Sequence, residues 1–219
     1  MKNLEKEQDM TDKVCQSLFE EKINHCFRAE SEWIREKAHD LHAGVNQTYG
    51  DNLPYGYHLD MVAEQVKRYA DEVCKDEADI LPLYFGAYFH DAIEDARQTY
   101  NDIMKLAGQI LDARQAYLAT EIVYALTNEK GRNRNERAND KYYQGIRETP
   151  YAPFVKLADR MANMIYACRQ QDGMNNRMRD VYKEELPHFV MAIDPGRSDD
   201  SRFILPAIMI QELEQIIKE

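Results

Sequence analysis

The chain has 219 residues, of which 44% are hydrophobic and 31% charged, and its formal net charge is −11 at pH 7. This length suffices for one large domain with a substantial core. Only 9 glycines and 7 prolines occur, which fits a helical protein better than a sheet-rich or disordered one. The acidic balance argues against binding to nucleic acid or to an anionic membrane, because both generally need a basic face.

Cysteine usage and the first residues indicate the compartment. The four cysteines are widely spaced and form no CxxC pattern: Cys15, Cys26, Cys74 and Cys168. We expect reduced thiols in a cytoplasmic protein. Residues 1–11 are polar and predict a flexible leader, and no segment approaches the roughly 20 apolar residues of a membrane span. With no repeat and no domain boundary visible, residues 12–219 are expected to form a single helical domain.

Apolar residues recur at helical spacing along most of the chain, which predicts an all-α fold. The predicted helices are one or two within 14–41, then 58–70, 82–95, 100–108, 112–127, 150–169, 176–193 and 203–218. Asp79 is placed to cap the start of the helix that contains Pro82. Residues 43–57 are rich in Gly, Asn, Asp and Pro and predict a loop. Residues 128–141 are the most polar internal stretch, with a second half that can be helical, and 194–201 form a connector.

The apolar run that ends at Phe89 is followed at once by ionisable residues: His90, Asp91, Glu94 and Asp95. Burying such groups is costly unless each is paired or ligated. On a continuous helix His90 and Glu94 share a face, as do Asp91 and Asp95, so all four side chains lie along one polar patch. The patch suggests a metal site. The alternative is a helix that turns to solvent, with His90 paired to a nearby carboxylate.

Two further segments supply side chains of the same chemistry. His58 stands where the 43–57 loop meets a helix, a place that equally suits a cap or a surface residue. Lys156, Asp159 and Asn163 share one face of another helix, and the alternative there is an exposed ion pair worth a few tenths of a kcal/mol. In chain order the candidate ligands are His58, His90, Asp91 and Asp159. Two imidazoles and two carboxylates suit a divalent ion such as manganese or iron better than a closed structural zinc.

Four segments together resemble a known family: PYGYH, FHDAIEDA, ALTNEKGRNRNER and VKLADRMANM. They resemble the HD-domain metal-dependent phosphohydrolases, and within them the branch that hydrolyses guanosine tetraphosphate. The resemblance covers roughly residues 35–170. It implies an all-α HD-domain helical bundle with an ion ligated by His58, His90, Asp91 and Asp159. The ion is manganese in that branch, with iron, cobalt or magnesium as alternatives.

The same resemblance assigns further roles. Glu94 and Asp95 match the acidic pair that positions or deprotonates the attacking water, and Asn163 matches a residue that lines the nucleotide pocket. We also expect Tyr55 and Lys156 to contribute to substrate binding. A bound divalent cation lowers the pKa of its water from ~16 towards ~7, so the protein needs only to fix the ion and one nearby carboxylate. The chain has no room for the synthetase half of the bifunctional enzymes, and we expect hydrolysis only.

Cations for an anionic substrate must come from outside residues 38–66, which contain no Lys or Arg. A basic segment supplies five of them: Lys130, Arg132, Arg134, Arg137 and Lys141. In an acidic protein such a cluster suits an anionic ligand, and arginine makes bidentate contacts with phosphate. We expect its last three members to contact the substrate. The alternative is a solvated loop whose charges balance Glu129, Glu136 and Asp140.

The sequence therefore predicts an enzyme that hydrolyses a phosphate ester or pyrophosphate group of a nucleotide. The first expectation is the 3′-pyrophosphate of guanosine tetraphosphate. Two alternatives stay open: an HD phosphohydrolase of another nucleotide, either a monophosphate or a triphosphate, and a non-catalytic helical module that senses a nucleotide. A small-molecule nucleotide is the expected partner, without nucleic acid or membrane, and the sequence leaves room for a homo-oligomer.

Overall fold

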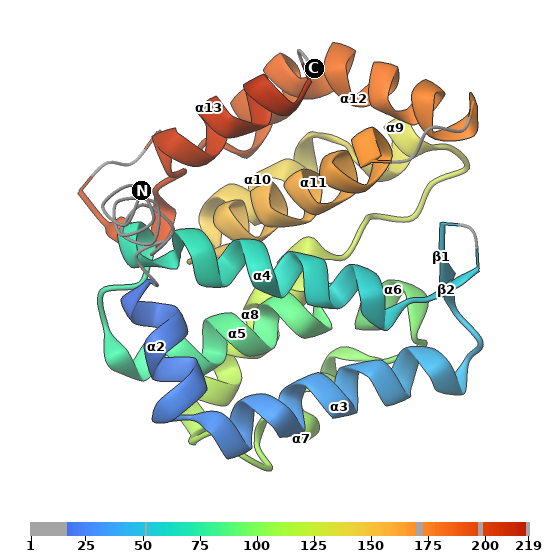
Figure 1. The fold of residues 1–219 in the computed structure, drawn as a ribbon. Helices are drawn as coiled ribbons and strands as arrows, with labels where there is room; N and C mark the ends of the chain where they lie inside the picture. Colours follow the sequence, from blue (N-terminus) through green and yellow to red (C-terminus); the bar gives the residue numbers. More distant parts are fainter. Residues whose placement is uncertain (1–16, 51, 170–172, 197–198, 218–219) are drawn as a thin grey trace, which may run out of the picture.

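The computed structural model describes residues 17–50, 52–169, 173–196 and 199–217. In these residues helices account for nearly all regular structure, and a two-stranded antiparallel hairpin is the only sheet. The predicted all-α class is confirmed, and the helices form a bundle (Figure 1). The predicted leader, residues 1–11, lies outside the described residues.

The elements in chain order are α2 (Leu18–His25), α3 (Arg28–Gly44), β1 (Thr48–Tyr49), β2 (Leu53–Pro54), α4 (Gly56–Val73), the 3₁₀ helix η1 (Glu77–Asp79), α5 (Ile80–Phe89), α6 (Ala92–Asp95), α7 (Tyr100–Ala107), α8 (Ala113–Leu126), α9 (Arg134–Arg137), α10 (Asp140–Glu148), α11 (Ala152–Arg169), α12 (Gly173–Ile193), the 3₁₀ helix η2 (Ser201–Phe203) and α13 (Ala207–Ile216).

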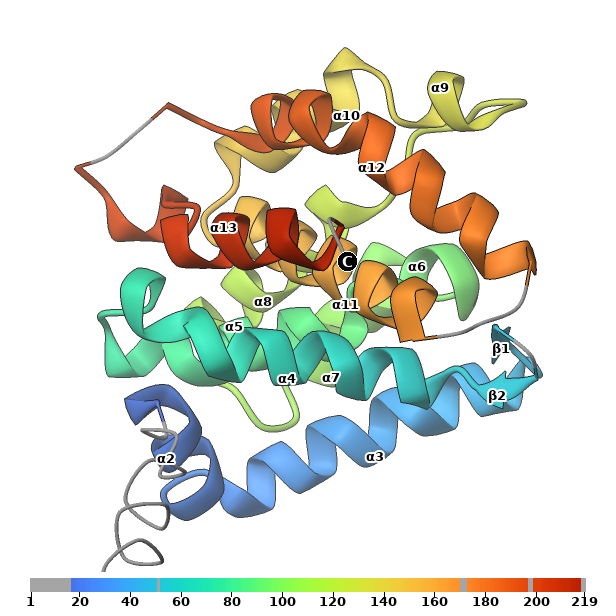
Figure 2. The same ribbon diagram turned by 45° about the horizontal axis from the view of Figure 1, so that its top comes forward.

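Helix α4 lies at the centre of the bundle. It packs most extensively against α11 and also contacts α2, α3 and α5. On one side α5 packs on α8, and α8 packs on α7; on the other side α10, α12 and α13 cover α11. The β1–β2 hairpin lies at one end of the bundle, between the end of α3 and the start of α4 (Figure 2). It therefore stands beside the first turn of the central helix.

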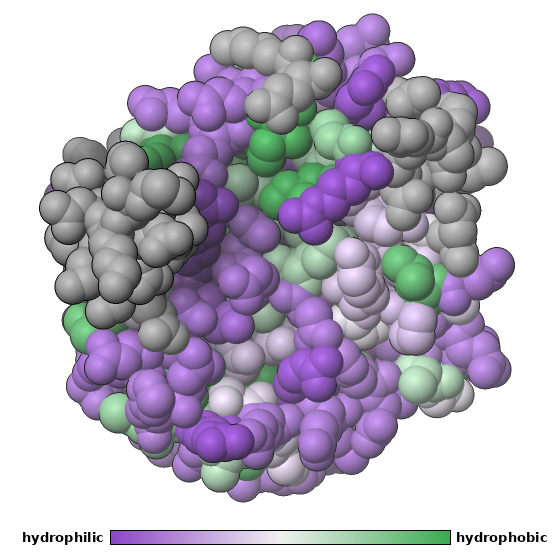
Figure 3. Space-filling view, in the orientation of Figure 1, coloured by the Kyte–Doolittle hydropathy of each residue, from purple (hydrophilic) through white to green (hydrophobic). Residues whose placement is uncertain are grey.

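Apolar side chains from α2 through α13 form one continuous core. Helix α5 is buried along all 10 of its residues, which explains why its sequence shows an apolar run instead of an apolar stripe. Gly86 permits close packing of α5 on α8, because a Cβ there would come within 2.6 Å of a methyl carbon of Ile122. On the face of the protein seen in Figure 3 most of the surface is hydrophilic, as expected for a highly charged, acidic chain.

The helix predicted over 82–95 is wrong in one respect, since it breaks in the middle. Helix α5 ends at Phe89, and α6 begins only at Ala92. Asp91 leaves the helical conformation, with φ −100° and ψ 3°. His90 and Asp91 therefore stand at a break between two helices, where their side chains follow tertiary contacts instead of a regular helical face.

Three other expectations need correction. The predicted loop at 43–57 contains the hairpin, with Thr48 opposite Pro54, and α10 was not predicted. The side chain of Asn139 caps α10 by accepting a hydrogen bond from the backbone of Tyr142. Asp79 occupies the N-cap position of α5 but makes no capping hydrogen bond. Its carboxylate is used by tertiary partners instead.

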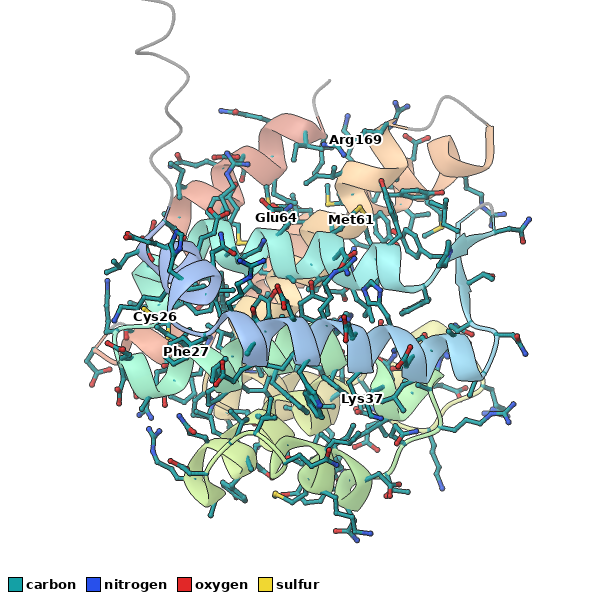
Figure 4. All side chains as sticks on the ribbon, turned by 60° about the horizontal axis from the view of Figure 1, so that its bottom comes forward. Cys26, Phe27, Lys37, Met61, Glu64 and Arg169 are labelled. Carbon is teal, nitrogen blue, oxygen red and sulfur yellow. The ribbon has the colours of Figure 1, made fainter. Side chains whose placement is uncertain are left out.

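No disulfide joins the described cysteines, Cys26, Cys74 and Cys168, and Cys26 is exposed at the turn between α2 and α3 (Figure 4). No helix among the described residues combines the length and the apolar character needed to cross a membrane.

Candidate metal centre

His58 from α4, His90 from the α5–α6 break and Asp159 from α11 converge on one point. One donor atom from each lies within 4.8 Å of the others, so the group could hold a metal ion. The two histidines are buried, and the side chain of Asp159 is 13% exposed. Asp91 completes the set, because its Oδ2 lies 2.9 Å from Nε2 of His90 and 3.7 Å from Nε2 of His58. These four residues, all predicted as ligands, are called the candidate centre below.

The spacing of the donor atoms suits one ion. In an octahedral shell with bonds of about 2.1 Å, adjacent donors lie about 3 Å apart and opposite donors about 4.2 Å apart. Asp159 Oδ1 lies 3.3 Å from Nε2 of His58 and 4.0 Å from Nε2 of His90. Nε2 of His90 is buried and has no hydrogen-bond partner, although Asp91 lies beside it. A cation at this point would satisfy that orphaned nitrogen, so the residues fit a metal ion.

Outer contacts orient three of the four candidate ligands, as second partners commonly do in metal sites. Nδ1 of His90 lies 2.8 Å from the carbonyl oxygen of Ala87. A carbonyl only accepts, so Nδ1 carries a hydrogen, and Nε2 is the nitrogen that can offer a lone pair to an ion once it has released its own proton. The Tyr55 hydroxyl donates to Oδ2 of Asp91 at 2.5 Å. Asp159 is held by two partners, which are described next.

Asp159 uses both carboxylate oxygens. Its Oδ2 forms an ion pair with Nζ of Lys156 at 2.9 Å, and its Oδ1 accepts from the Asn163 amide at 2.6 Å. Lys156 and Asn163 thus share the helical face predicted for them. The Lys156 side chain is only 18% exposed, so the exposed ion pair considered as an alternative is excluded. This lysine brings a buried positive charge to the edge of the candidate centre.

Charges compensate one another within the centre. Burial by itself would raise the pKa of Asp159, but Lys156, His58 and His90 together outweigh burial and hold that pKa well below the ordinary value. Burial would likewise raise the pKa of Asp91, and His90 lowers it. Burial tends to lower the pKa of His90, yet Asp91 and Asp159 raise it to about 9. Without an ion, two carboxylates are therefore balanced by Lys156 and a protonated His90.

The two acidic residues of α6 differ in their surroundings. Glu94 accepts hydrogen bonds from the Asn128 side chain at 2.7 Å and from its backbone at 3.3 Å. The continuous helix on which His90 and Glu94 were predicted to share a face is interrupted between them. Asp95 stays close to the centre, where burial and the neighbouring Asp91 raise its pKa. The charge of the candidate centre thus reaches Asp95, the less exposed of the two acids of α6.

A cavity of about 170 Å³ opens beside Asp159. It is lined by Asn128, Ala138, Tyr142, Tyr143, Lys156, Asp159, Arg160, Asn163, Tyr182 and Phe189. Arg160 lies with its guanidinium 4.7 Å from the ring centre of Tyr182 and 4.2 Å from that of Phe189, and it pairs with Glu185 at 3.0 Å. The cavity thus joins the candidate centre to α10 and α12, and two cations from α11 line it.

No protein-family model matches this chain, and no curated protein matches it in sequence. The function is therefore inferred from the residues of the candidate centre and the cavity.

The structure divides the residues predicted to bind substrate. Lys156 and Asn163 line the cavity, but Tyr55 does not. The ring of Tyr55 is buried and its hydroxyl is bonded to Asp91. Tyr49 was not predicted as a site residue, although its ring stacks on His58 with 4.8 Å between ring centres. Its position in a predicted loop gives no periodic signal from which this role could have been predicted.

Two of the five cations of the basic segment are held by local partners. Arg132 pairs with Glu136, and Lys141 pairs with Glu129 at 2.7 Å. Arg137 is exposed, and the side chain of Arg134 lies outside the described residues. Among the side chains that the structure describes, these pairs match the alternative of a charge-balanced, solvated loop. Contact of Arg134, Arg137 and Lys141 with phosphate stays a prediction.

Proposed function

We propose that this protein is a metal-dependent phosphohydrolase of the HD type that acts on a nucleotide. One observation carries the proposal: the buried Nε2 of His90, which has no hydrogen-bond partner, faces the carboxylates of Asp91 and Asp159, and an outer partner orients each of the three residues. This arrangement suits a site built to hold a cation. The order His58, His90-Asp91, Asp159 and the segments around these residues support the HD assignment.

The chemistry follows from the neighbours of the centre. When bound, a divalent ion supplies an activated water and polarises a phosphoryl oxygen. Asp95, whose pKa is raised by burial and by Asp91, would be the carboxylate that holds the proton released from such a water. Glu94, fixed by Asn128, orients water or substrate from the adjoining position. Lys156 presents its charge to the cavity and attracts the phosphate group.

The donor set guides the choice of metal. Two imidazoles and two carboxylates favour manganese or iron over a closed structural zinc, and manganese is our first choice, with cobalt and magnesium as alternatives. As substrate we first propose guanosine tetraphosphate, cleaved at its 3′-pyrophosphate. The salt bridges of Arg132 with Glu136 and of Lys141 with Glu129 leave fewer cations for a nucleotide with four phosphates. This favours a nucleotide with fewer phosphates, a mono- or triphosphate, as the second candidate.

The test combines metal analysis with turnover. Purified protein is assayed with manganese on guanosine tetraphosphate, GTP and GMP, and its metal content is measured. We expect metal-dependent release of pyrophosphate or phosphate that is lost in Asp159→Asn and kept in Glu214→Gln, an exposed acid on α13. Equal turnover in both variants would refute the proposal. Nucleotide binding without turnover in metal-loaded protein would favour the sensing module.

A further inference from the structure

Two tyrosines of the hairpin segment reach the candidate centre from one side. Tyr55, which follows β2, donates its hydroxyl to Oδ2 of Asp91 at 2.5 Å. Tyr49, in β1, donates to Oδ1 of Asn163 at 2.9 Å. The amide of Asn163 in turn donates to Oδ1 of Asp159 at 2.6 Å. One short hairpin segment therefore bonds, directly or through one residue, to both carboxylates of the centre.

Both rings are fixed by stacking. The ring of Tyr49 lies 4.8 Å from that of His58 at an angle of 21°, and the ring of Tyr55 lies 4.5 Å from that of His42 at 11°. His42 is 1% exposed, and neither of its ring nitrogens has a hydrogen-bond partner. The contribution of His42 here is thus the face of its ring, which holds Tyr55 in place.

The tip of the hairpin is anchored to α11. Gly50 has a φ of +51°, a conformation that favours glycine. A Cβ at this position would lie 1.9 Å from the hydroxyl oxygen of Tyr166, so only glycine allows so close an approach. Tyr166 also packs against Tyr49, with 4.7 Å between ring centres. The hairpin is therefore held against the same helix that carries Asp159.

We propose that the β1–β2 hairpin organises the candidate centre, with Tyr55 positioning Asp91 directly and Tyr49 positioning Asp159 through Asn163. The inference rests on the proposed metal site. Asp91 stands at a helix break, so the regular backbone of a helix does not fix its side chain. A hydroxyl that bonds one carboxylate oxygen limits how that carboxylate can turn toward an ion. Both tyrosines are positioning residues.

The test removes one hydroxyl at a time. Tyr55→Phe and Tyr49→Phe are compared with Tyr124→Phe, which alters a tyrosine that is 58% exposed on α8. Manganese affinity is measured by competition with a chelator, and the visible spectrum of the cobalt-loaded protein reports ligand geometry. We expect Tyr55→Phe to weaken binding about 10- to 100-fold and to change the spectrum. Tyr49 acts on Asp159 only through Asn163, so Tyr49→Phe should weaken manganese binding less. Tyr124→Phe should leave both the affinity and the spectrum unchanged.

Wild-type affinity and an unchanged cobalt spectrum in Tyr55→Phe would overturn the inference. A second comparison adds Tyr55→Phe to Asp91→Ala: if Tyr55 acts through Asp91, the double variant binds no more weakly than Asp91→Ala alone. If Tyr55→Phe weakens manganese binding as much in the Asp91→Ala background as in the wild type, the inference is contradicted. If Tyr55→Phe does not fold, Tyr49→Phe decides, since lost affinity supports the inference and wild-type affinity overturns it. Wild-type protein that binds no ion would instead refute the proposed function.

Discussion

A bound divalent ion should raise the thermal stability of this protein measurably. The candidate ligands come from α4, the α5–α6 break and α11, so the unfolded chain has no assembled site and the ion binds mainly the folded state. With free ion at 100 times its Kd, this linkage stabilises the fold by about 2.7 kcal/mol. In a chain of 219 residues each kcal/mol shifts the melting temperature by about 2–4 °C, which gives a shift of about 5–11 °C.

Calorimetry of protein stripped with a chelator and then titrated with manganese measures this shift. His90→Ala removes one donor, and a hundredfold loss of affinity at the same ion concentration leaves about 0.4 kcal/mol, or about 1–2 °C. The matched control is His25→Ala, which removes an exposed histidine at the end of α2 and should retain the full shift. An equal shift in both variants would show that the ion binds elsewhere, and the assignment of the centre would then be wrong.

Three further outcomes are expected. Asp95→Asn should keep the metal and lower kcat by a factor on the order of 10²–10⁴, the usual range for a lost general base. Glu94→Gln should lower kcat less. Near-normal kcat in both variants would contradict these roles. Tyr151→Phe should lower the free energy of unfolding by about 1.5–3 kcal/mol in denaturant titrations, because the buried Tyr151 hydroxyl donates to the buried carboxylate of Asp79 at 2.7 Å. His42→Phe should raise that free energy by about 1 kcal/mol, since two unpartnered buried nitrogens are removed; a loss of stability would reveal a partner for them.

The residues near the centre differ in how far sequence could predict their roles. Lys156, Asp159 and Asn163 lie within one helix, so their shared face follows from helical geometry alone, and the structure confirms it. Glu94 was predicted to share a face with His90 by the same geometry, which assumed a continuous helix over 82–95. The helix is interrupted between Phe89 and Ala92. The apolar run before this point contains no residue pattern that predicts the interruption.

The sequence by itself determined the helical class, because apolar spacing and turn residues are properties of neighbouring positions. It also determined the chemical types of the candidate ligands, since His58, His90, Asp91 and Asp159 stand out from the residues around them.

Only the tertiary structure decided which partners these groups have. Tyr55 and Asp91 are 36 positions apart, and Tyr49 and Asn163 are 114 apart. No local pattern encodes a hydrogen bond between such residues, because it forms only when separate elements pack at the right distance. For that reason the sequence could not show that Tyr55 is bonded to the candidate ligand Asp91. For the same reason it could not show that Arg132 and Lys141 are held by Glu136 and Glu129.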